Sequence, residues 1–392
     1  MIKINDKKDC CGCNACVQKC PASCMAMLED QEGFLYPQID TKLCTNCGLC
    51  EKVCPVINQS SKRKPLYTCA AKNKNETIRK DSSSGGVFSL LAEYVLSQKG
   101  IVFGAHFNES WEVIHDYTEN IAGLAAFRGS KYVQSKIENS FVKAEQFLKS
   151  DRIVLFSGTP CQIKGLRLFL QCEYENLLTV DFVCHGVPSP KVWRMYLQEL
   201  VKSTKFQKET AINFSLNDIT NIEFRSKSSG WKRFSFLADM YMPEKNFTFS
   251  EPLDKNIFMR GFLSDLYLRP SCYACPSKCF KSGSNITVGD YWGIEHLLPE
   301  YDDDKGISLV MLHTSKAFDI YRNMDADSME TLYENAFSSN PAIEKSAKIH
   351  KNRKSFFSQI DNNKKSIFAL IETSLRASLG ERIKRWAKRM LK

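Results

Sequence analysis

Two cysteine-rich runs near the start of the chain have the residue types and spacing of iron–sulfur ligands. Each run reads C-x2-C-x2-C-x3-C-P. In this pattern three thiolates surround one corner of a 4Fe–4S cubane, and the fourth, held by the proline turn, reaches the other cluster. The first cluster is therefore expected on Cys10, Cys13, Cys16 and Cys54, and the second on Cys44, Cys47, Cys50 and Cys20.

Zinc is the alternative metal for closely spaced cysteines. It prefers isolated C-x2-C pairs and sites with four ligands. Two intact four-cysteine runs, closed by Pro21 and Pro55, favour clusters instead. Cys11 and Cys24 lie off the pattern and are interpreted as packing residues.

Later cysteines offer a third group of thiols. Cys161 follows a buried strand and opens a helix, where the helix dipole favours a thiolate. Cys184 follows the next strand at the equivalent edge, and Cys272 and Cys275 form a C-x2-C pair. Four thiolates are enough for a third cluster, which ligand number and type favour. A zinc site and a redox-active dithiol near a flavin remain as alternatives.

Two polar loops have residues suited to a phosphate or pyrophosphate. Residues 82–86 (Ser-Ser-Ser-Gly-Gly) precede a helix expected from Val87, whose free amides and dipole would favour an anion. Serine also caps many helices that bind nothing. Residues 128–132 (Arg-Gly-Ser-Lys-Tyr) form a second candidate anion loop, with a solvated turn as the alternative. Residues 225–232 combine cations with Trp231 and could bind an acidic substrate, although a solvated hairpin loop is slightly favoured.

The elements that must position these residues are an N-terminal module over 1–58, a basic linker over 58–64 and an α/β region after it. Strands are expected at 101–105, 151–156 and 177–183, helices at 87–98 and 162–170, and an antiparallel sheet over 212–249. The tail over 367–392 is expected to be helical. Its basic amphipathic end, with Ile383 and Trp386 at helical spacing, suits an anionic membrane, a partner protein or its own domain.

The bulk composition narrows the class of protein. The chain has 392 residues and 17 cysteines, no apolar stretch long enough to span a membrane and no secretory leader. These features predict a cytoplasmic protein, in which cysteines are metal ligands rather than disulfides. The formal charge is +10, but the basic residues form no long patch interleaved with aromatics, so we expect no nucleic-acid partner.

Five motifs in one order give the chain a specific resemblance. They are Ser84-Gly85-Gly86-Val87, Gly129-Ser130-Lys131-Tyr132, Gly158-Thr159-Pro160-Cys161-Gln162, Cys184-His185-Gly186, and Ile286-Thr287-Val288-Gly289-Asp290-Tyr291-Trp292-Gly293. This order resembles the family of coenzyme F420 hydrogenase/dehydrogenase beta subunits, fused to an N-terminal ferredoxin, over roughly residues 1–313. The resemblance implies FAD beside a 4Fe–4S cluster, with electrons passing between the flavin, the clusters and a redox partner protein such as ferredoxin.

The resemblance also assigns residues. FAD-contacting residues would be Ser84, Gly85, Gly86, Ser130, Lys131, Tyr132 and Thr159. Third-cluster ligands would be Cys161, Cys184, Cys272 and Cys275. Cys279 is an additional thiol that could replace one of these four.

Two residues are candidates for catalysis. His185 could shuttle a proton to a reduced flavin or a substrate, although a histidine that caps the strand is favoured. Asp290 lies between Gly289 and Gly293 and could orient substrate or flavin; a turn-stabilising role is equally favoured.

Taken together, we expect an α+β chain with a two-cluster ferredoxin domain at 1–58, an α/β flavoprotein domain at 66–330 and a helical basic segment at 331–392. The expected function is an FAD-dependent iron–sulfur oxidoreductase acting on a small organic substrate, with surface-polysaccharide metabolism as one setting. The alternative is an electron-transfer subunit or adaptor that feeds a partner enzyme. The basic tail would allow peripheral contact with the inner face of the membrane.

Overall fold

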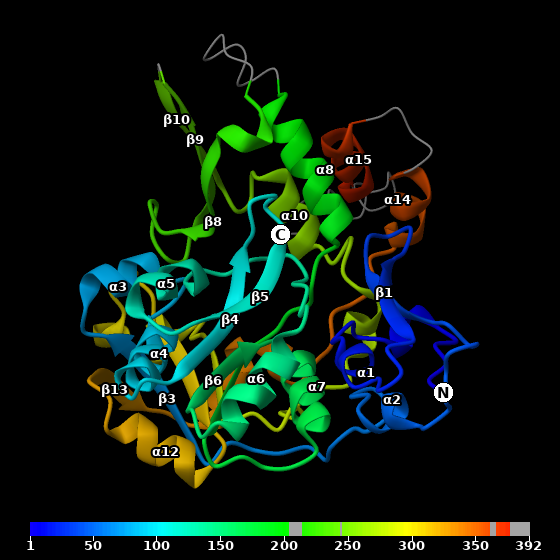
Figure 1. The fold of residues 1–392 in the computed structure, drawn as a ribbon. Coiled ribbons are helices and arrows are strands. Elements are labelled where there is room, and N and C mark those ends of the chain that lie inside the picture. Colours follow the sequence, from blue (N-terminus) through cyan, green and yellow to red (C-terminus); the bar gives the residue numbers. More distant parts are fainter. Residues whose placement is uncertain (204–213, 244, 361–365, 377–392) are drawn as a thin grey trace, which may run out of the picture.

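The N-terminal module is small and built around one hairpin. The computed structural model describes residues 1–203, 214–243, 245–360 and 366–376 (Figure 1). Strands β1 (Met25–Glu29) and β2 (Leu35–Ile39) pair antiparallel, with Met25 opposite Ile39. Beside the hairpin lie the 3-10 turn η1 (Lys7–Asp9) and the short helices α1 (Ala15–Gln18) and α2 (Leu49–Lys52).

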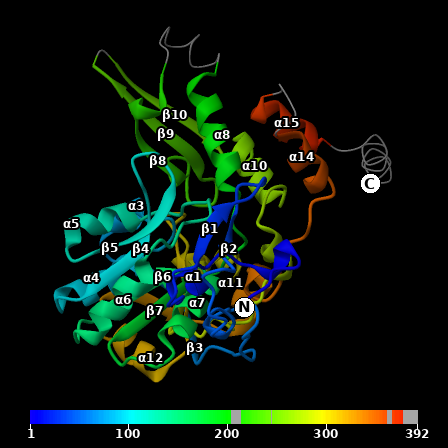
Figure 2. The same ribbon diagram turned by 45° about the vertical axis from the view of Figure 1, so that its right-hand side comes forward.

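The hairpin tip packs against helix α8 (Pro190–Val201). Gly33 has a φ of +86°, and a Cβ there would lie 2.2 Å from the Lys191 Cβ, so a larger residue would push the hairpin away. Next to it, Ser189 Oγ donates to Glu32 O at 2.5 Å. Figures 1 and 2 both place the module, in dark blue, beside helix α7 (Pro160–Leu170).

An eight-stranded mixed sheet forms the centre of the next region, ordered β13-β3-β12-β11-β7-β6-β4-β5. Strands β4, β6, β7 and β11 run parallel, and each outer strand is antiparallel to its inner neighbour. Their bounds are β3 (Tyr67–Asn73), β4 (Ile101–Phe107), β5 (Val113–Thr118), β6 (Val154–Gly158), β7 (Leu177–Phe182), β11 (Ile286–Asp290), β12 (Ser308–Leu312) and β13 (Ala326–Glu330).

Helices cover both faces of this sheet. Along β4 the side chains alternate, so Ile101 and Phe103 pack on one face and Val102 on the other. Helices α6 (Ser140–Lys149) and α7 cover the first face, which also contacts the N-terminal module. Helices α4 (Val87–Ser97) and α12 (Ser315–Arg322) cover the second. The module therefore packs on the same side of the sheet as α6 and α7.

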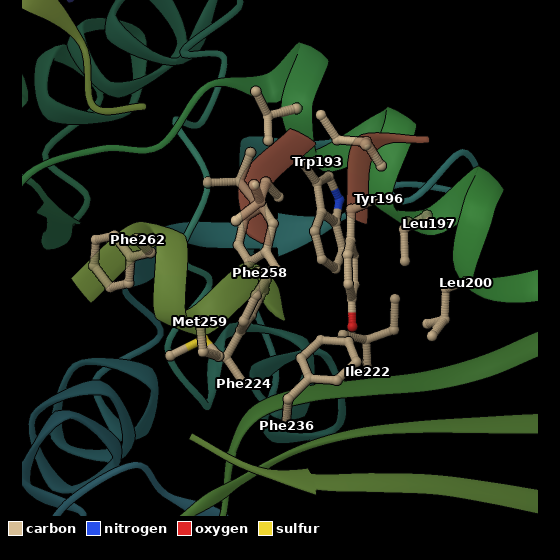
Figure 3. Packing of buried hydrophobic residues seen from close by; sticks show 14 of the residues in the cluster. Trp193, Tyr196, Leu197, Leu200, Ile222, Phe224, Phe236, Phe258, Met259 and Phe262 are labelled. Carbon is tan, nitrogen blue, oxygen red and sulfur yellow. The ribbon is translucent and has the colours of Figure 1, made fainter. Parts of the chain in front are cut away.

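A three-stranded antiparallel sheet, ordered β10-β9-β8, encloses an aromatic core with α8 and α10 (Ile257–Leu263). Figure 3 shows Trp193 and Tyr196 of α8 facing Phe236 and Phe258. Trp193 is 1% exposed, and its Nε1 donates to Trp111 O at 2.7 Å, so its one polar atom is satisfied. The strands are β8 (Ile219–Ser226), β9 (Ser235–Met242) and β10 (Lys245–Pro252).

The C-terminal helices join the same aromatic core. Phe356 of α14 (Arg353–Ile360) and Leu370 of α15 (Ile367–Leu375) are buried in it. The expected basic end of the tail lies outside the described residues, which stop at 376. No helix of the described segments is long and apolar enough to cross a membrane.

The remaining described elements are short connectors. The helices are α3 (Glu76–Asp81), α5 (Ile121–Leu124), α11 (Ile294–Leu297) and α13 (Tyr333–Ser339). The 3-10 turns are η2 (Ala125–Phe127), η3 (Leu216–Asp218), η4 (Pro270–Ala274), η5 (Pro299–Tyr301) and η6 (Pro341–Ile343).

Most elements expected from the sequence are present. The three expected strands are β4, β6 and β7, the two expected helices are α4 and α7, and the antiparallel sheet is β8 to β10. The mixed α/β character is thereby confirmed. Strands β3, β12 and β13 are not among the expected elements; each pairs with a segment distant in the chain, which the local sequence pattern does not indicate.

One buried histidine makes the stability of this fold depend on pH. His115 on β5 is 4% exposed and stacks on Phe156, with ring centroids 5.7 Å apart. Its Nε2 lies 3.1 Å from Ser157 O, and its Nδ1 has no partner among the described residues. Burial lowers the pKa of His115 to about 4. The folded state thus binds fewer protons than the unfolded state between about pH 4 and 6.5.

We expect His115→Gln to weaken the pH dependence of stability. The neutral ring contributes to the free energy of unfolding above about pH 6.5, and this contribution is lost as the pH falls. The loss should be about 1 kcal/mol between pH 7.5 and 5.5. Burial raises the pKa of Asp181 to about 6, so its titration changes the stability in the opposite direction as the pH falls. The stability of the variant is therefore compared with that of the parent chain at each pH. Anaerobic denaturant unfolding provides the measurement, and parallel pH curves for parent and variant would contradict the expectation.

Candidate redox centres

Cysteines from both N-terminal runs line the first cavity of the module. Cys54 from the second run joins three cysteines of the first. The cavity thus brings together the four cysteines that the sequence assigns to the first cluster. The cysteines lining it are Cys10, Cys11, Cys13, Cys16 and Cys54.

A second cavity shows the reciprocal arrangement. Cys20 from the first run joins three cysteines of the second, and Cys24 Sγ lies 3.4 Å from Cys20 Sγ. Cys47 is exposed, so this cavity reaches the protein surface. The cysteines lining it are Cys20, Cys24, Cys44, Cys47 and Cys50.

The chemistry of these two donor sets fits cubane clusters. Burial, together with nearby thiols that include Cys10 and Cys54, raises the pKa of Cys16 to about 12. A positive metal core would reverse that effect and hold the sulfurs as thiolates. In the described part of the chain, no three His, Cys, Asp or Glu side chains are arranged around a single metal ion.

The third group of cysteines meets at the carboxyl ends of the parallel strands. Cys161 opens α7 after β6, and Cys184 follows β7. Burial raises the pKa of Cys184 well above its ordinary value, and the neighbouring Cys272, Cys161 and Cys275 thiols also raise it. Val187 N donates to Cys272 Sγ at 3.4 Å, which joins the Cys184 loop to the C-x2-C segment. The four cysteines are therefore neighbours in the fold.

Cys279 has different surroundings from these four. It is buried, with a φ of +57°, and its Sγ lies 3.9 Å from Glu344 O. Its backbone N donates to Ile343 O at 3.1 Å, which ties it to the segment after α13. The geometry therefore favours Cys161, Cys184, Cys272 and Cys275 as the group of neighbouring thiols over a group in which Cys279 replaces one of these four.

Cys11 connects the first cavity to the third cysteine group. Its thiol packs in one hydrophobic cluster with Cys13 and Cys161, and the neighbouring Cys11 thiol and burial raise the pKa of Cys161 well above its ordinary value. Close packing accompanies it, because a Cβ at Gly165 of α7 would lie 3.0 Å from Cys13 Sγ. We interpreted Cys11 as a packing residue from the sequence. Its position beside Cys10 in a ligand run was the available signal that it lies among the metal-binding thiols.

The two polar loops lie against each other in the fold. Ser130 donates to Ser83 Oγ from its backbone N at 2.6 Å and from its Oγ at 2.9 Å. Ser84 Oγ donates to Ile307 O at 2.7 Å. A Cβ at Gly85 would lie 2.2 Å from Ala71 O, so this loop approaches β3 too closely for any side chain.

The other expected cofactor residues have separate partners. Gly86 caps α4 with a φ of +83°. Lys131 Nζ donates to Ala126 O and Arg128 O at 2.7 and 2.8 Å, and burial lowers its pKa to about 7. Thr159 caps α7 and lies 3.2 Å from Cys161 Sγ through its Oγ1.

A buried ion pair, missed from the sequence, organises the loops. Arg225 donates to both carboxylate oxygens of Asp290, at 2.6 and 3.0 Å, and also to Ser83 O and Tyr132 Oη, both at 3.2 Å. Its side chain is 3% exposed. Burial opposes the cation, but Asp290 and Tyr132 hold the Arg225 pKa above its ordinary range. The segment favoured as a solvated hairpin loop is therefore anchored inside the protein at this end.

Asp290 and His185 each have an oriented side chain. Trp231 Nε1 donates to Asp290 Oδ1 at 2.9 Å, so Asp290 accepts from an indole as well as from Arg225. His185 Nε2 lies 2.6 Å from Asp265 Oδ1, and its ring is 40% exposed. The histidine is thus paired with a carboxylate from a distant segment, beside Cys184.

Comparisons with known proteins find family profiles that match three stretches of the chain. The profile for the C-terminal part of the coenzyme F420 hydrogenase/dehydrogenase beta subunit matches residues 151–335, and the profile for its N-terminal part matches 68–141. A 4Fe-4S dicluster domain profile matches residues 9–58.

Two curated relatives are similar over about half of this chain. One, a subunit of the F(420)H(2) dehydrogenase of Methanosarcina mazei, is 26% identical over 215 residues, covering 49% of this chain and 60% of the relative. Coenzyme F420-dependent sulfite reductase of Methanocaldococcus jannaschii is 28% identical over 213 residues, covering 52% and 32%. The chain thus spans less than two thirds of either relative.

A chain of the F420-reducing NiFe hydrogenase complex from Methanosarcina barkeri also matches in structure. It is 18% identical, with a TM-score of 0.46, over 77% of this chain and 94% of that one.

We expect Asp290→Asn to destabilise the protein because it leaves Arg225 buried without a counter-charge. The free energy of unfolding should fall by about 3 kcal/mol. Asp319→Asn is the matched control, because its pair with Arg322 is more than 60% exposed on both sides and should contribute less than about 0.5 kcal/mol. Anaerobic guanidinium unfolding of both variants makes the comparison. Equal, small losses would show that the buried pair does not support the fold.

Proposed function

This chain belongs to the family of coenzyme F420 hydrogenase/dehydrogenase beta subunits and has an N-terminal 4Fe-4S dicluster domain, and from that premise we propose that it is an iron–sulfur flavoprotein oxidoreductase. It would exchange single electrons with a redox partner protein and two electrons with a small organic substrate. The domains would be those expected at 1–58 and 66–330, with 331–392 as a C-terminal segment.

The observation that carries the proposal is the continuous series of cysteine groups. The second cavity reaches the surface at Cys47, the first lies deeper in the module, and Cys11 joins it to Cys161. The eight cysteines of the two runs would hold two clusters, and Cys161, Cys184, Cys272 and Cys275 a third. A buried series that begins at an exposed thiol is suited to a partner that delivers electrons one at a time.

The cofactor site would be the paired loops at the amino end of α4. Ser83 and Ser130 provide hydroxyls, and the first turn of α4 provides backbone amides for a phosphate group. A flavin-type cofactor bound there would convert between single electrons and hydride. FAD is our expectation, and the deazaflavin coenzyme in the names of both curated relatives is the competing cofactor. Those names give no support to surface-polysaccharide metabolism.

Among the catalytic candidates, we propose that His185 carries a proton. Asp265 Oδ1 accepts a hydrogen bond from His185 Nε2, which fixes the imidazole ring and leaves its Nδ1 to accept a proton. Asp290 is better suited to positioning, because Arg225 and Trp231 already occupy its oxygens. We propose that Asp290 acts on the cofactor site through Arg225 and the serine loop.

An electron-transfer subunit is the alternative function. The relative from Methanosarcina mazei is by name one subunit of a dehydrogenase, and it favours this alternative. A purified chain that reduces or oxidises F420 or another small molecule would support the enzyme. A chain that only reduces dyes, or a co-purifying protein, would support the adaptor.

We expect anaerobically purified protein to contain about twelve irons and one flavin-type cofactor per chain. Iron, sulfide and zinc are measured directly, and mass spectrometry of the released cofactor distinguishes FAD from F420. About eight irons with no cofactor would leave only the two-cluster module and contradict the flavoprotein proposal. About eight irons with one zinc would assign the third cysteine group to zinc.

We expect Cys272→Ser to lose about four of these irons and Cys279→Ser to lose none. The reason is that Cys272 lies near Cys184 and Cys161, whereas the Cys279 thiol lies beside Glu344 O. The two substitutions are matched in chemistry and both positions are at least partly buried, so iron per chain compares them directly. Equal iron loss in the two variants would place Cys279 in the ligand set.

A further inference from the structure

One buried arginine lies where the N-terminal module meets the third cysteine group. Arg269 is 0% exposed and lies three residues before Cys272. Its Nε donates to Cys10 O at 2.8 Å and its Nη1 to Gln134 Oε1 at 2.9 Å. Its Nη2 donates to Leu35 O at 2.9 Å and approaches Cys10 Sγ at 3.5 Å. The guanidinium thus binds the first-cluster loop through its backbone and its sulfur.

This cation differs from the other buried arginines in its counter-charge. Arg225 is paired with Asp290, and Arg353, at the same module interface, is paired with Glu32 at 2.7 Å. Within the described residues, no ion pair includes Arg269. The rings of Tyr36 and Phe34 lie 4.4 and 5.4 Å from its Cζ, and such contacts offset only part of the cost of burying a charge.

The first-cluster loop is built around the guanidinium. Gly12, between Cys10 and Cys13, has a φ of +71°, and a Cβ there would lie 2.7 Å from both Arg269 Nη1 and Gln134 Nε2. Gln134 Nε2 donates to Cys11 O at 3.1 Å, so one amide holds both the loop and the arginine. Only a residue without a side chain lets the ligand loop pass this close to a fixed cation.

We propose that Arg269 is a positioning residue that raises the reduction potential of the cluster held by Cys10, Cys13, Cys16 and Cys54. The inference rests on the cluster assignment in the proposed function. Uptake of one electron adds one negative charge to a cluster with four thiolate ligands. A cation held against Cys10 Sγ in a water-excluded interface stabilises that added charge. The cluster in turn supplies the counter-charge that the protein does not.

The position of Arg269 makes this effect selective. The guanidinium touches the first cavity, whereas the second cavity reaches solvent at Cys47, where water and salt screen distant charges. Loss of the cation should therefore move one of the two module potentials and leave the other. Arginine keeps its charge at every pH at which the protein folds, so the effect is permanent rather than a switch.

Arg269→Gln tests the proposal in an EPR-monitored redox titration of the anaerobically purified full chain. At a fixed potential, the ratio of reduced to oxidised first cluster should fall at least tenfold, a shift of about −59 mV for a one-electron couple. The second cluster is the internal reference. Unchanged potentials, or equal shifts of both clusters, would overturn the proposal.

Two controls separate charge from structure. Arg269→Lys keeps the cation and should hold the ratio within about threefold, so a shift equal to that of Arg269→Gln would overturn the proposal. Arg353→Gln removes a cation of the same interface that contacts Glu32, Leu268 and aromatic rings rather than a cysteine. It should leave both potentials in place.

A second variant keeps the test decisive if Arg269→Gln accumulates without its clusters. Gln134→Glu retains the arginine and puts a carboxylate where Oε1 now accepts from Nη1. It should lower the first-cluster potential in the same direction, and an unchanged potential would overturn the proposal. Iron and cofactor analysis of the parent chain is read separately. A parent with about eight irons and no cofactor would contradict the flavoprotein function and leave the arginine inference standing.

Discussion

Four buried thiols in one place repel one another as thiolates unless a positive charge lies among them. The chain gathers cysteines in three places, and in the first and third of them the burial that raises the pKa of Cys16 and Cys184 acts against the charged form. The rest of the packing follows from keeping these groups buried and adjacent. Gly33 and Gly165 allow the module to approach α8 and α7 closely, and Arg269 supplies a cation at their junction.

The parallel part of the large sheet provides a common edge for residues that lie far apart in the chain. Cys161, Cys184 and Asp290 each stand at or just after the carboxyl end of a parallel strand, so they belong to one edge. Arg225, from the three-stranded sheet, reaches across to Asp290 and to the serine loop. A single buried ion pair therefore links the two sheets at the candidate cofactor site.

The proposed electron path depends on how the N-terminal module packs against the α/β region, because neither of them contains the whole path. The first cavity belongs to the module, the third cysteine group to the α/β region, and the contact of Cys11 with Cys161 joins them. Helices α14 and α15 pack into the aromatic core with Trp193, so the C-terminal segment supports the same region that carries Arg225. Displacement of the module would separate the first cavity from Cys161 and remove the cation from Cys10.

The amino-acid sequence by itself determined the parts whose chemistry is local. Two C-x2-C-x2-C-x3-C-P runs were sufficient to predict a dicluster module, because each run of eleven residues carries three ligands of one cluster and one of the other. Short buried apolar runs located β4, β6 and β7, and helical spacing located α4 and α7. The ordered motifs identified the family. Only the tertiary structure decided that Arg225 pairs with Asp290, that Cys11 lies against Cys161 and that Arg269 contacts Cys10. These partners lie 65, 150 and 259 residues apart, where spacing gives no signal and only packing brings the side chains together.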